Sequence, residues 1–439
     1  MKITLVCLIG LVASFLWINV APSMVSKLAF EGFQIVMVSI VIWQACDPFA
    51  DAAQYFGERW RIPGSVRGAT LDAVASSLPE LFTGLFFVMV VITTAADPAA
   101  GQAAHNSGEG FGATIATCAG SAVYNMILIP AFCGITIALT RHWKPVIEID
   151  RKVITRDGFW FLVCEIVLVA FLFQKQLSWH LAAVLFLLYG IYLAWLWLDA
   201  LKYRAARLEA IETLRQLPSP DDDQIRQTLA QAGVSPSPSL IDYVRHELNH
   251  DDPETDSTEH VETAGVFFGW FDIHLRPAVG YAILAASTAV TAMACFWLVE
   301  ITLSIAETLN VPLFFVAVIV AAAASSVPDT LLSIAAAKRG DDDGAVSNAF
   351  GSNIFDICIC LSVPLIAGII LNEGQPIDLV VDGKPMPGLF GLQILLLTMT
   401  VITLGVLAKD FRLTMLKSCF LVGLYLIFFG YAVLGSLGY

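Results

Sequence analysis

Long apolar runs separated by short polar segments dominate the sequence. A transmembrane helix needs about 20 mostly apolar residues, and the runs mostly reach or approach this length. The first run follows Lys2 and could be a secretory signal peptide. It has no clear small-residue cleavage site before Pro22, so we interpret it as a transmembrane helix that stays in the mature protein. The pattern predicts an all-α integral membrane protein with eleven spans, at residues 3–21, 33–50, 64–93, 111–139, 158–174, 180–198, 278–306, 312–337, 344–371, 388–408 and 418–437.

Composition supports this class and excludes others. Of the 439 residues, 57% are hydrophobic and 14% are charged, whereas soluble domains average about a quarter charged residues. An ordinary cytosolic enzyme, a disordered chain, a coiled coil and a small disulfide scaffold are therefore excluded. The net charge is −14 and no basic block is present, which argues against nucleic acid as a partner. Nine cysteines without a CxxC pair are interpreted as apolar packing residues.

The basic residues predict the orientation of the spans. Twenty of the 24 Lys and Arg residues fall in loops on one side, while only Lys27, Lys175 and Lys384 fall on the other. By the positive-inside rule, the N-terminus is predicted to be cytoplasmic and the C-terminus outside. No organelle-targeting segment is evident, so the expected location is the cell membrane (the inner membrane in a bacterium).

The segment 199–277 is then a cytoplasmic linker, and its pattern is helical. Leu201–Leu217 continues the preceding span as an amphipathic helix. Asp221–Asp223 can cap a second short helix that runs through Ala232. No regulatory β-sandwich is expected here.

Two motifs occur twice. Ala75–Glu80 matches Ala324–Asp329, and one span later Gly120–Asn125 matches Gly351–Asp356. The loop inside the first pair lacks Lys and Arg, whereas the loop inside the second carries both, so the two halves cross the membrane in opposite senses. Inverted repeats of this kind are typical of secondary transporters. They predict ten core helices in two inverted five-helix repeats at 33–198 and 278–439, joined by the linker 199–277, with an extra N-terminal helix in 1–32.

Three carboxylates, those of Glu80, Asp329 and Asp356, lie within these apolar spans. Each costs at least about 2.5–3.5 kcal/mol at mid-membrane, and a bound cation would offset that cost. Pro79 and Pro328 precede two of the acids and deprive the carbonyl four residues back of its helical partner. Such breaks are tolerated at membrane depth where they line a cavity.

Oxygen-bearing side chains repeat at helical spacing around the acids. Ser76 and Ser325 lie four residues before Glu80 and Asp329, so they share a helix face with them. Ser121 with Asn125, and Ser352 with Asp356, repeat that spacing. We interpret the set as an oxygen cage for one divalent ion or several monovalent ones. Close helix packing by small residues is the alternative interpretation for the serines, Gly120 and Gly351. No His or Cys joins the set, which argues against zinc or copper.

These stretches resemble the cation/calcium exchanger superfamily, and most of all its potassium-dependent sodium/calcium exchanger branch. The resemblance covers roughly residues 33–198 and 278–437 and includes Ala45–Asp47, Gly68–Leu81, Gly120–Asn125 and Ser347–Asp356. It implies a transporter, not an enzyme, that needs no cofactor and extrudes Ca²⁺ as Na⁺ enters.

The resemblance also implies roles for single residues. Glu80 and Asp329 match the central ion ligands. The family usually has Gly where Ala75 and Ala324 stand. Further matching positions are Ser76, Ser77, Ser121, Asn125, Ser325, Ser326, Ser352 and Asp356.

Two of these positions bear on the coupling ion. Asp356 looks like the potassium-dependent branch, because sodium-only animal relatives carry Asn there. Asn125 stands where the proton-coupled branch usually carries Glu, which favours Na⁺ over H⁺.

Several alternatives stay open at this point. They are an antiporter of H⁺ or of other divalent cations, a passive cation channel, and an intramembrane aspartyl protease, whose expected Gly-x-Gly-Asp sequence is absent. The spans 33–50 and 278–306 are predicted to be gating helices. Asp47 and Asp51 either contribute to an ion path or simply lie near the cytoplasmic end of their helix. The sequence leaves open whether K⁺ is co-transported and which oligomeric state the protein adopts.

Overall fold

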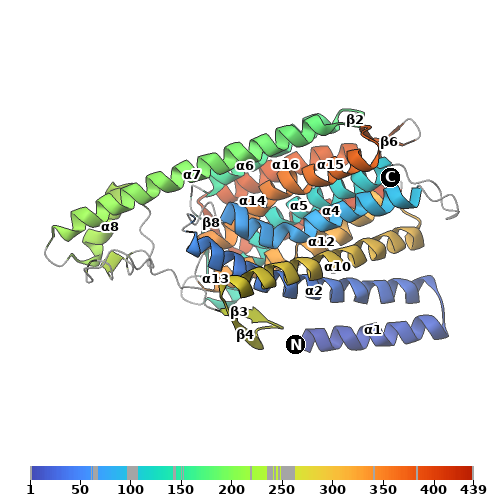
Figure 1. The fold of residues 1–439 in the computed structure, drawn as a ribbon, viewed down its shortest axis with the longest axis horizontal. Coiled ribbons are helices and arrows are strands. Elements are labelled where there is room, and N and C mark those ends of the chain that lie inside the picture. Colours follow the sequence, from blue (N-terminus) through green and yellow to red (C-terminus); the bar gives the residue numbers. More distant parts are fainter. Residues whose placement is uncertain are drawn as a thin grey trace.

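A bundle of long helices makes up most of the molecule (Figure 1). The computed structural model describes residues 2–60, 62, 68–95, 107–141, 145–149, 151, 153–217, 220–234, 241, 244, 245, 248, 263–339, 342–381 and 384–437. The membrane-length helices lie roughly side by side, and the two termini lie toward opposite ends of the bundle.

Nineteen helical segments follow one another along the described chain, four of them short π-helical turns labelled η. They are α1 (Lys2–Val20), α2 (Met24–Arg59), η1 (Gly68–Asp72), α4 (Ala73–Ala95), α5 (Ser107–Thr140), η2 (Val153–Asp157), α6 (Gly158–Leu172), α7 (Trp179–Arg215), α8 (Asp222–Gln231), α10 (Pro277–Leu309), α11 (Leu313–Val316), η3 (Ala317–Ala321), α12 (Ala322–Ser325), α13 (Val327–Arg339), α14 (Asp342–Phe355), η4 (Asp356–Cys360), α15 (Ser362–Leu371), α16 (Leu389–Ala408) and α17 (Met415–Ser436).

Short antiparallel strand pairs connect the ends of these helices. Three of the pairs join two-residue strands, and the fourth, β3–β4, is a longer hairpin. The pairs are β1 (Ile147–Glu148) with β8 (Arg412–Leu413), β2 (Gln176–Leu177) with β5 (Ile377–Asp378), β3 (Thr263–Val266) with β4 (Phe271–His274), and β6 (Val380–Val381) with β7 (Lys384–Pro385).

Each of the eleven predicted spans corresponds to a helix or to a run of consecutive helices, which confirms the all-α membrane fold. In the described residues, eight helices are long and apolar enough to cross a membrane. A ninth span is formed when the bent pair Leu313–Ser325 and Val327–Lys338 is counted as one. The two remaining predicted spans are α1 and α6, which are apolar but shorter.

The two motif-bearing spans differ in shape. The second repeat is bent by 42° where α12 ends and α13 begins, at Ser326 before Pro328. The predicted break is therefore present there. In the first repeat it is wrong, because α4 continues through Pro79 without interruption.

Both repeats share a wider helical turn at the same place. The π-helical turns η1 and η3 begin twelve residues before Glu80 and Asp329, respectively. Such turns are rare and occur often at functional sites. Each one widens the backbone ahead of the acidic residue, and neither was predicted from the sequence.

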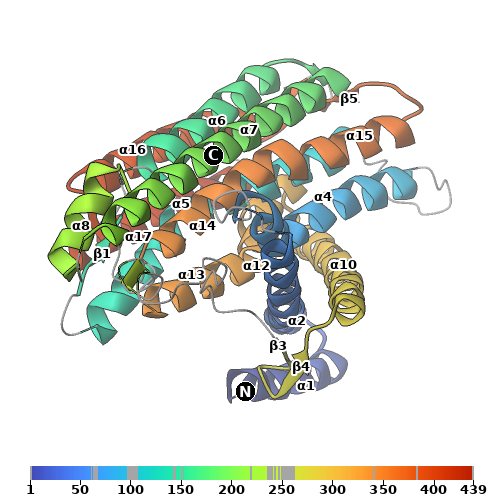
Figure 2. The ribbon, with the colours of Figure 1, turned by 60° about the vertical axis from the view of Figure 1, so that its left-hand side comes forward.

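The helices α2 and α10, the two predicted gating helices, pack against each other along their length (Figure 2). The hydroxyl of Ser304 on α10 donates to Glu31 Oε1 on α2, so one end of the pair is joined by a buried hydrogen bond. On the far side of α2 lies α1, where the Phe15 and Phe30 rings are 5.7 Å apart.

The segment between the two halves is only partly helical. As predicted, α7 continues past the bundle without a break, and α8 begins at Asp222 after its N-cap Asp221, which forms a capping box with Gln224. A small apolar cluster joins them, with Leu214, Ile225 and Leu229 completely or almost completely buried. The hairpin β3–β4 was not predicted. The acidic stretch that ends at Glu262 lies outside the described residues.

Gly120 and Gly351 are equivalent in sequence but not in packing, and this difference is testable. A Cβ on Gly120 would collide with the carbonyl oxygen of Val318 in η3, whereas one on Gly351 would meet nothing within 4 Å. Gly120→Ala should therefore lower the free energy of unfolding by about 1–3 kcal/mol, as overpacking usually does. Gly351→Ala is the matched control. Thermal unfolding in detergent measures both, and equal melting temperatures would contradict the packing role of Gly120.

Candidate cation site

Three acidic side chains lie in the interior of the bundle. Glu80 is on α4, Asp329 is in the first turn of α13, and Asp356 begins η4. All three are completely buried. Removing a charge from water costs several kcal/mol even after the protein relaxes, so the surroundings of these carboxylates must compensate.

The hydroxyl of Ser121 on α5 lies between two of the carboxylates. Its Oγ is 3.1 Å from Glu80 Oε1 and 3.2 Å from Asp356 Oδ2. The same oxygen is 2.9 Å from the hydroxyl of Ser326, which itself donates to Glu80 Oε1 at 3.3 Å. A hydroxyl has one hydrogen, so Ser121 cannot donate to both carboxylates at once.

Two amides approach the third carboxylate. Asn125 Nδ2 lies 3.5 Å from Asp329 Oδ2 and 3.3 Å from Ser121 Oγ. Asn348 Nδ2 lies 3.5 Å from Asp329 Oδ1 and 3.2 Å from Ser333 Oγ. These distances are at the long end for hydrogen bonds. Asn125 thereby links Asp329 to the group around Glu80 and Asp356.

Several oxygens of this cluster have no hydrogen-bond partner. Glu80 Oε2, Asp356 Oδ1 and Asn125 Oδ1 are buried and find no hydrogen-bond partner among the described residues. Leaving such a group unsatisfied costs about 1–3 kcal/mol, and more if it is charged. Hard oxygen atoms are the ligands that Ca²⁺ prefers. A cation bound next to one of them would supply its missing partner.

The remaining predicted serines surround the same carboxylates. Ser76 and Ser352 neighbour Asp329, Ser325 neighbours Glu80, and Ser77 neighbours Asp356. Three of these hydroxyls donate to carbonyls of their own helices, which leaves their lone pairs free to face a cation. All ten predicted site residues thus gather in one region: Ser76, Ser77, Glu80, Ser121, Asn125, Ser325, Ser326, Asp329, Ser352 and Asp356.

The cluster is not a preformed closed metal centre. Within the described part of the chain, no three His, Cys, Asp or Glu side chains converge closely enough to hold a metal by themselves. Among the same residues, no Lys, Arg or His forms an ion pair with Glu80, Asp329 or Asp356. Hydroxyl and amide groups, in place of basic side chains, therefore neighbour the three carboxylates in the described structure.

Two thiols contact the backbone next to the first acid. Cys295 on α10 lies 3.5 Å from the carbonyl of Pro79, and Cys360 in η4 lies 3.6 Å from that of Ser77. Thiols are weak donors, so these contacts satisfy the carbonyls only in part. They place the predicted gating helix α10 directly against the motif of α4.

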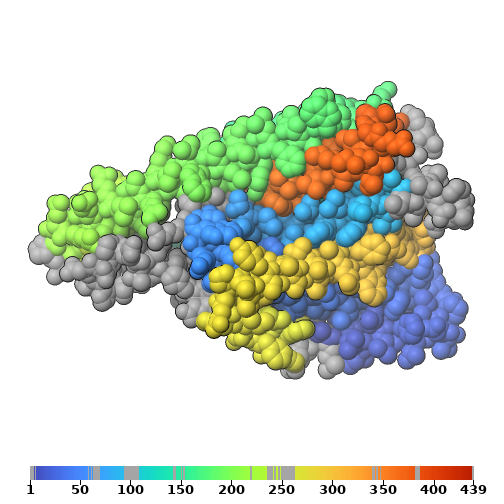
Figure 3. Space-filling view, in the orientation of Figure 1, coloured from blue at the N-terminus to red at the C-terminus, as the bar shows by residue number. Residues whose placement is uncertain are grey.

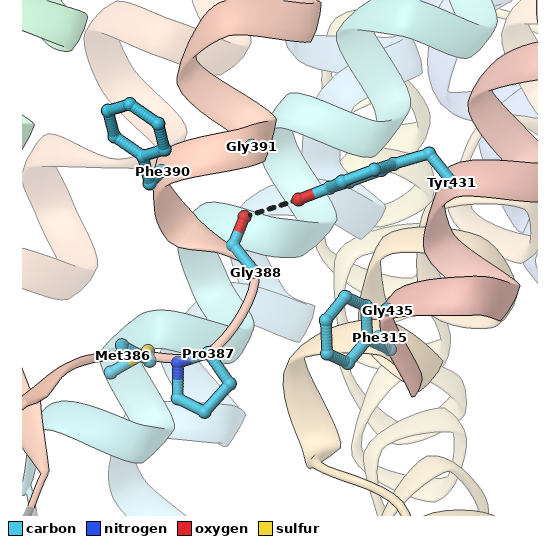
Figure 4. A pocket seen from close by; sticks show the side chains of 8 residues that line it. All are labelled: Phe315, Met386, Pro387, Gly388, Phe390, Gly391, Tyr431 and Gly435. Carbon is cyan, nitrogen blue, oxygen red and sulfur yellow. Dashed lines mark hydrogen bonds between the residues drawn. The ribbon is translucent and has the colours of Figure 1, made fainter. Parts of the chain in front are cut away.

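A separate pocket lies elsewhere in the bundle and has a different character. It is lined by Phe315 and by residues at the start of α16 and near the end of α17, and Tyr431 donates to the carbonyl of Gly388 at 2.8 Å (Figure 4). No carboxylate and none of the predicted site residues lines it. Its mostly apolar walls do not suit a cation.

Sequence reasoning missed Asn348 as a site residue. The residue stands one helical turn before Ser352, and the same spacing recurs between Thr117 and Ser121. Thr117, however, donates to Ala113 of its own helix at 2.9 Å. The spacing was visible in the sequence, but only the fold tells that Asn348 reaches Asp329.

Comparison with known proteins agrees with this geometry. A family model described as "Sodium/calcium exchanger protein" matches residues 30–198 and 279–434. Because the match covers well over half of the chain, the protein belongs to this family of membrane transporters. The resemblance inferred from the motifs is thereby confirmed.

Among its relatives are proteins named sodium/potassium/calcium exchangers. Sodium/potassium/calcium exchanger 3 of Homo sapiens is 29% identical over 168 residues, which is 38% of this chain and 22% of that protein. Sodium/potassium/calcium exchanger 5 of Homo sapiens is 25% identical over 390 residues, or 78% of this chain and 71% of the relative. The match to the first spans less than a quarter of that relative's length.

A solved structure shares the fold. The crystal structure of the H⁺/Ca²⁺ exchanger CAX has a TM-score of 0.55 and 13% sequence identity, and the superposition covers 99% of this chain and 90% of the other. At this identity the likeness shows a common fold only.

Asn348 provides a test of the site that is independent of the acids. Asn348→Ala removes the amide next to Asp329 Oδ1, and the loss of one hydrogen bond of about 0.5–1.5 kcal/mol should weaken Ca²⁺ affinity about two- to tenfold. Thr117→Val, at the equivalent position of the first repeat, should leave it unchanged. Binding of ⁴⁵Ca²⁺ to the purified protein measures this, and identical affinities would remove Asn348 from the site.

Proposed function

We propose that the protein is a secondary active antiporter that exchanges Na⁺ for Ca²⁺ across the cell membrane by alternating access. The single observation that carries the proposal is the buried, unpaired set of oxygens at Glu80, Asn125 and Asp356, next to Asp329 and without a basic partner among the described residues. Membership of the exchanger family agrees with it.

The same physics couples the two ion fluxes. An empty cluster leaves up to three carboxylates uncompensated in a medium of low dielectric constant, which makes the transition between outward-open and inward-open states unfavourable. A Ca²⁺ ion or several Na⁺ ions neutralise the cluster and permit the transition. Ca²⁺ and Na⁺ therefore compete for overlapping positions, and a passive leak is suppressed.

The proposed moving parts are α2 and α10. They pack mainly against each other, and Ser304 with Glu31 joins them at one end. Cys295 brings α10 against the Pro79 carbonyl, so a movement of α2 and α10 would displace the backbone next to Glu80.

In this proposal, residues 33–198 and 278–439 form two inverted repeats around the site. The N-terminus and the segment 199–277 lie in the cytoplasm, and the C-terminus lies outside.

We further propose that K⁺ is transported together with Ca²⁺. Asp356 adds a third carboxylate where its counterpart in the first repeat is the neutral Asn125, and the extra charge favours an additional monovalent cation. The names of the relatives agree with this assignment. Coupling to H⁺ instead of Na⁺ is less favoured, because the neutral Asn125 occupies the place where the proton-coupled branch usually has a carboxylate.

The exchange can be tested in proteoliposomes with an imposed Na⁺ gradient. Glu80→Gln and Asp329→Asn each remove one buried charge, and we expect Ca²⁺ affinity to fall about ten- to a hundredfold, as for lost charge-assisted interactions of about 1.5–3 kcal/mol. The matched control is Glu165→Gln, a completely buried acid whose Oε1 accepts from Thr400 at 2.6 Å. Undiminished Na⁺-driven uptake of ⁴⁵Ca²⁺ by both site variants would refute the assignment. Uptake without any counter-ion would indicate a channel.

The role of Asp356 can be tested separately. Wild-type uptake is expected to rise when K⁺ accompanies Ca²⁺ and to be unaffected by a proton gradient alone. Asp356→Asn keeps the size of the side chain and removes its charge, so the variant should retain Na⁺-driven uptake and lose the K⁺ stimulation. Equal K⁺ stimulation in both proteins would contradict this role, and uptake driven by protons alone would favour the proton-coupled alternative.

A further inference from the structure

The hairpin β3–β4 carries a cluster of exposed aromatic rings at its tip. The strands pair from Thr263 with His274 to Val266 with Phe271, and the loop between them contains Phe267, Phe268, Gly269 and Trp270. Phe267, Trp270 and Phe271 are 64%, 65% and 60% exposed. We propose that this tip is a membrane anchor that inserts into the headgroup layer of the lipid leaflet on the side where the N-terminus lies.

The hairpin is fixed along α2 by hydrogen bonds to its backbone. The N–H of Gly265 donates to Asp51 Oδ2 at 3.1 Å, and the N–H of Phe268 donates to the side-chain oxygen of Gln44. The ring of Phe268 also meets Trp43 edge to face, with the centroids 5.8 Å apart. Asp51 thus serves to hold the hairpin. An N–H that lies near lipid needs such a partner.

These contacts set the depth of the tip. An α-helix rises about 1.5 Å per residue, so Gln44 lies roughly 10 Å along the axis of α2 from Asp51, toward the middle of the helix. The tip, which is bonded to Gln44, lies that much deeper than the part of the hairpin bonded to Asp51. The helix α1 runs antiparallel to α2 and provides a second measure of depth along α2, because Gly10 of α1 lies against Phe33 of α2 and Phe15 lies against Phe30. On this register Lys2, where α1 begins, falls level with residues 41–43 of α2, next to Gln44. The tip therefore lies at the level where a membrane helix begins.

The views agree with this placement. Figures 1 and 2 both show the hairpin beside the end of α2 and close to the start of α1. In Figure 3 it stands out from the side of the bundle, in yellow, instead of lying over the end of the helices. A lateral position directs its exposed rings toward surrounding lipid.

The chemistry of the tip fits an interface. Aromatic rings, Trp above all, are enriched where membrane meets water because one part of the ring is apolar and another is polar. Phe267 and Phe268 have φ angles of 53° and 62°, a left-handed conformation that is unusual for bulky residues. This turn conformation leaves the Phe267 ring exposed while the Phe268 ring packs against Trp43. Residues 263–274 contain no Lys or Arg, so attraction to anionic lipid does not explain binding.

The hairpin also leads directly into α10, which begins at Pro277. Because its strands are bonded to α2 and its chain continues into α10, an anchored tip would hold both helices at one membrane surface. This consequence does not depend on which ions are transported.

Depth-dependent fluorescence quenching tests the anchor. Trp270→Cys and, as a second tip position, Phe271→Cys are labelled with bimane in a Cys419→Ser background, since Cys419 is the one exposed cysteine among those described. Thr263→Cys at the exposed base of the hairpin is the matched control. The full-length protein is placed in nanodiscs of phosphatidylcholine, with nitroxide on the lipid headgroup as one quencher and aqueous iodide as the other.

We expect lipid nitroxide to quench both tip labels several-fold more strongly than the base label, and iodide to show the reverse order. The result should be the same when anionic lipid is added. Tip labels that iodide reaches as readily as the base label would overturn the proposal. Labels reached by neither quencher would show that the tip is buried against protein and would also overturn the proposal, and quenching that requires anionic lipid would contradict an aromatic anchor.

Discussion

The burial of three carboxylates without a basic partner is the constraint on which the rest of this structure depends. Glu80, Asp329 and Asp356 are completely buried, and among the described residues no ion pair neutralises them. Hydroxyls and amides reduce the cost but leave oxygens unpaired. In the proposed transport cycle, cations that enter and leave would compensate these charges. The bend of the α12–α13 segment and the packing around α5 bring the acids into one region of the bundle.

The two halves of the protein carry matching sequence motifs but differ in backbone shape, packing and charge at those motifs. Four sequence segments match in pairs, yet α4 continues through Pro79 whereas the equivalent span bends by 42° at Ser326. The backbone of η3 leaves no room for a side chain at Gly120, whereas nothing lies within 4 Å of the position that a Cβ would take at Gly351. The neutral Asn125 of one half corresponds in sequence to the acidic Asp356 of the other, and its amide lies 3.5 Å from Asp329 Oδ2. The two matching halves therefore differ in backbone shape, in packing and in charge.

Much of the fold was accessible from the sequence because the membrane imposes simple rules. Low charge, span length and the distribution of Lys and Arg predict the helices, and acids inside apolar runs point to the cluster that the structure brings together at Glu80, Asp329 and Asp356. The contact of Asn348 with Asp329, by contrast, depends on how α13 and α14 face each other. The hairpin β3–β4 is short and aromatic and is stabilised by Asp51 and Gln44, more than 200 residues earlier. The π-helical turns have no residue signature that sets them apart from ordinary helix.

Locating the transported ion by anomalous diffraction from crystals grown with Ca²⁺ tests the central claim most directly. The account predicts an anomalous peak within about 2.3–2.6 Å of carboxylate oxygens of Glu80 and Asp329, the usual Ca²⁺–oxygen distance, and its loss when Na⁺ replaces Ca²⁺. A Ca²⁺ peak bound elsewhere, with this cluster unoccupied in protein that transports calcium, would contradict it.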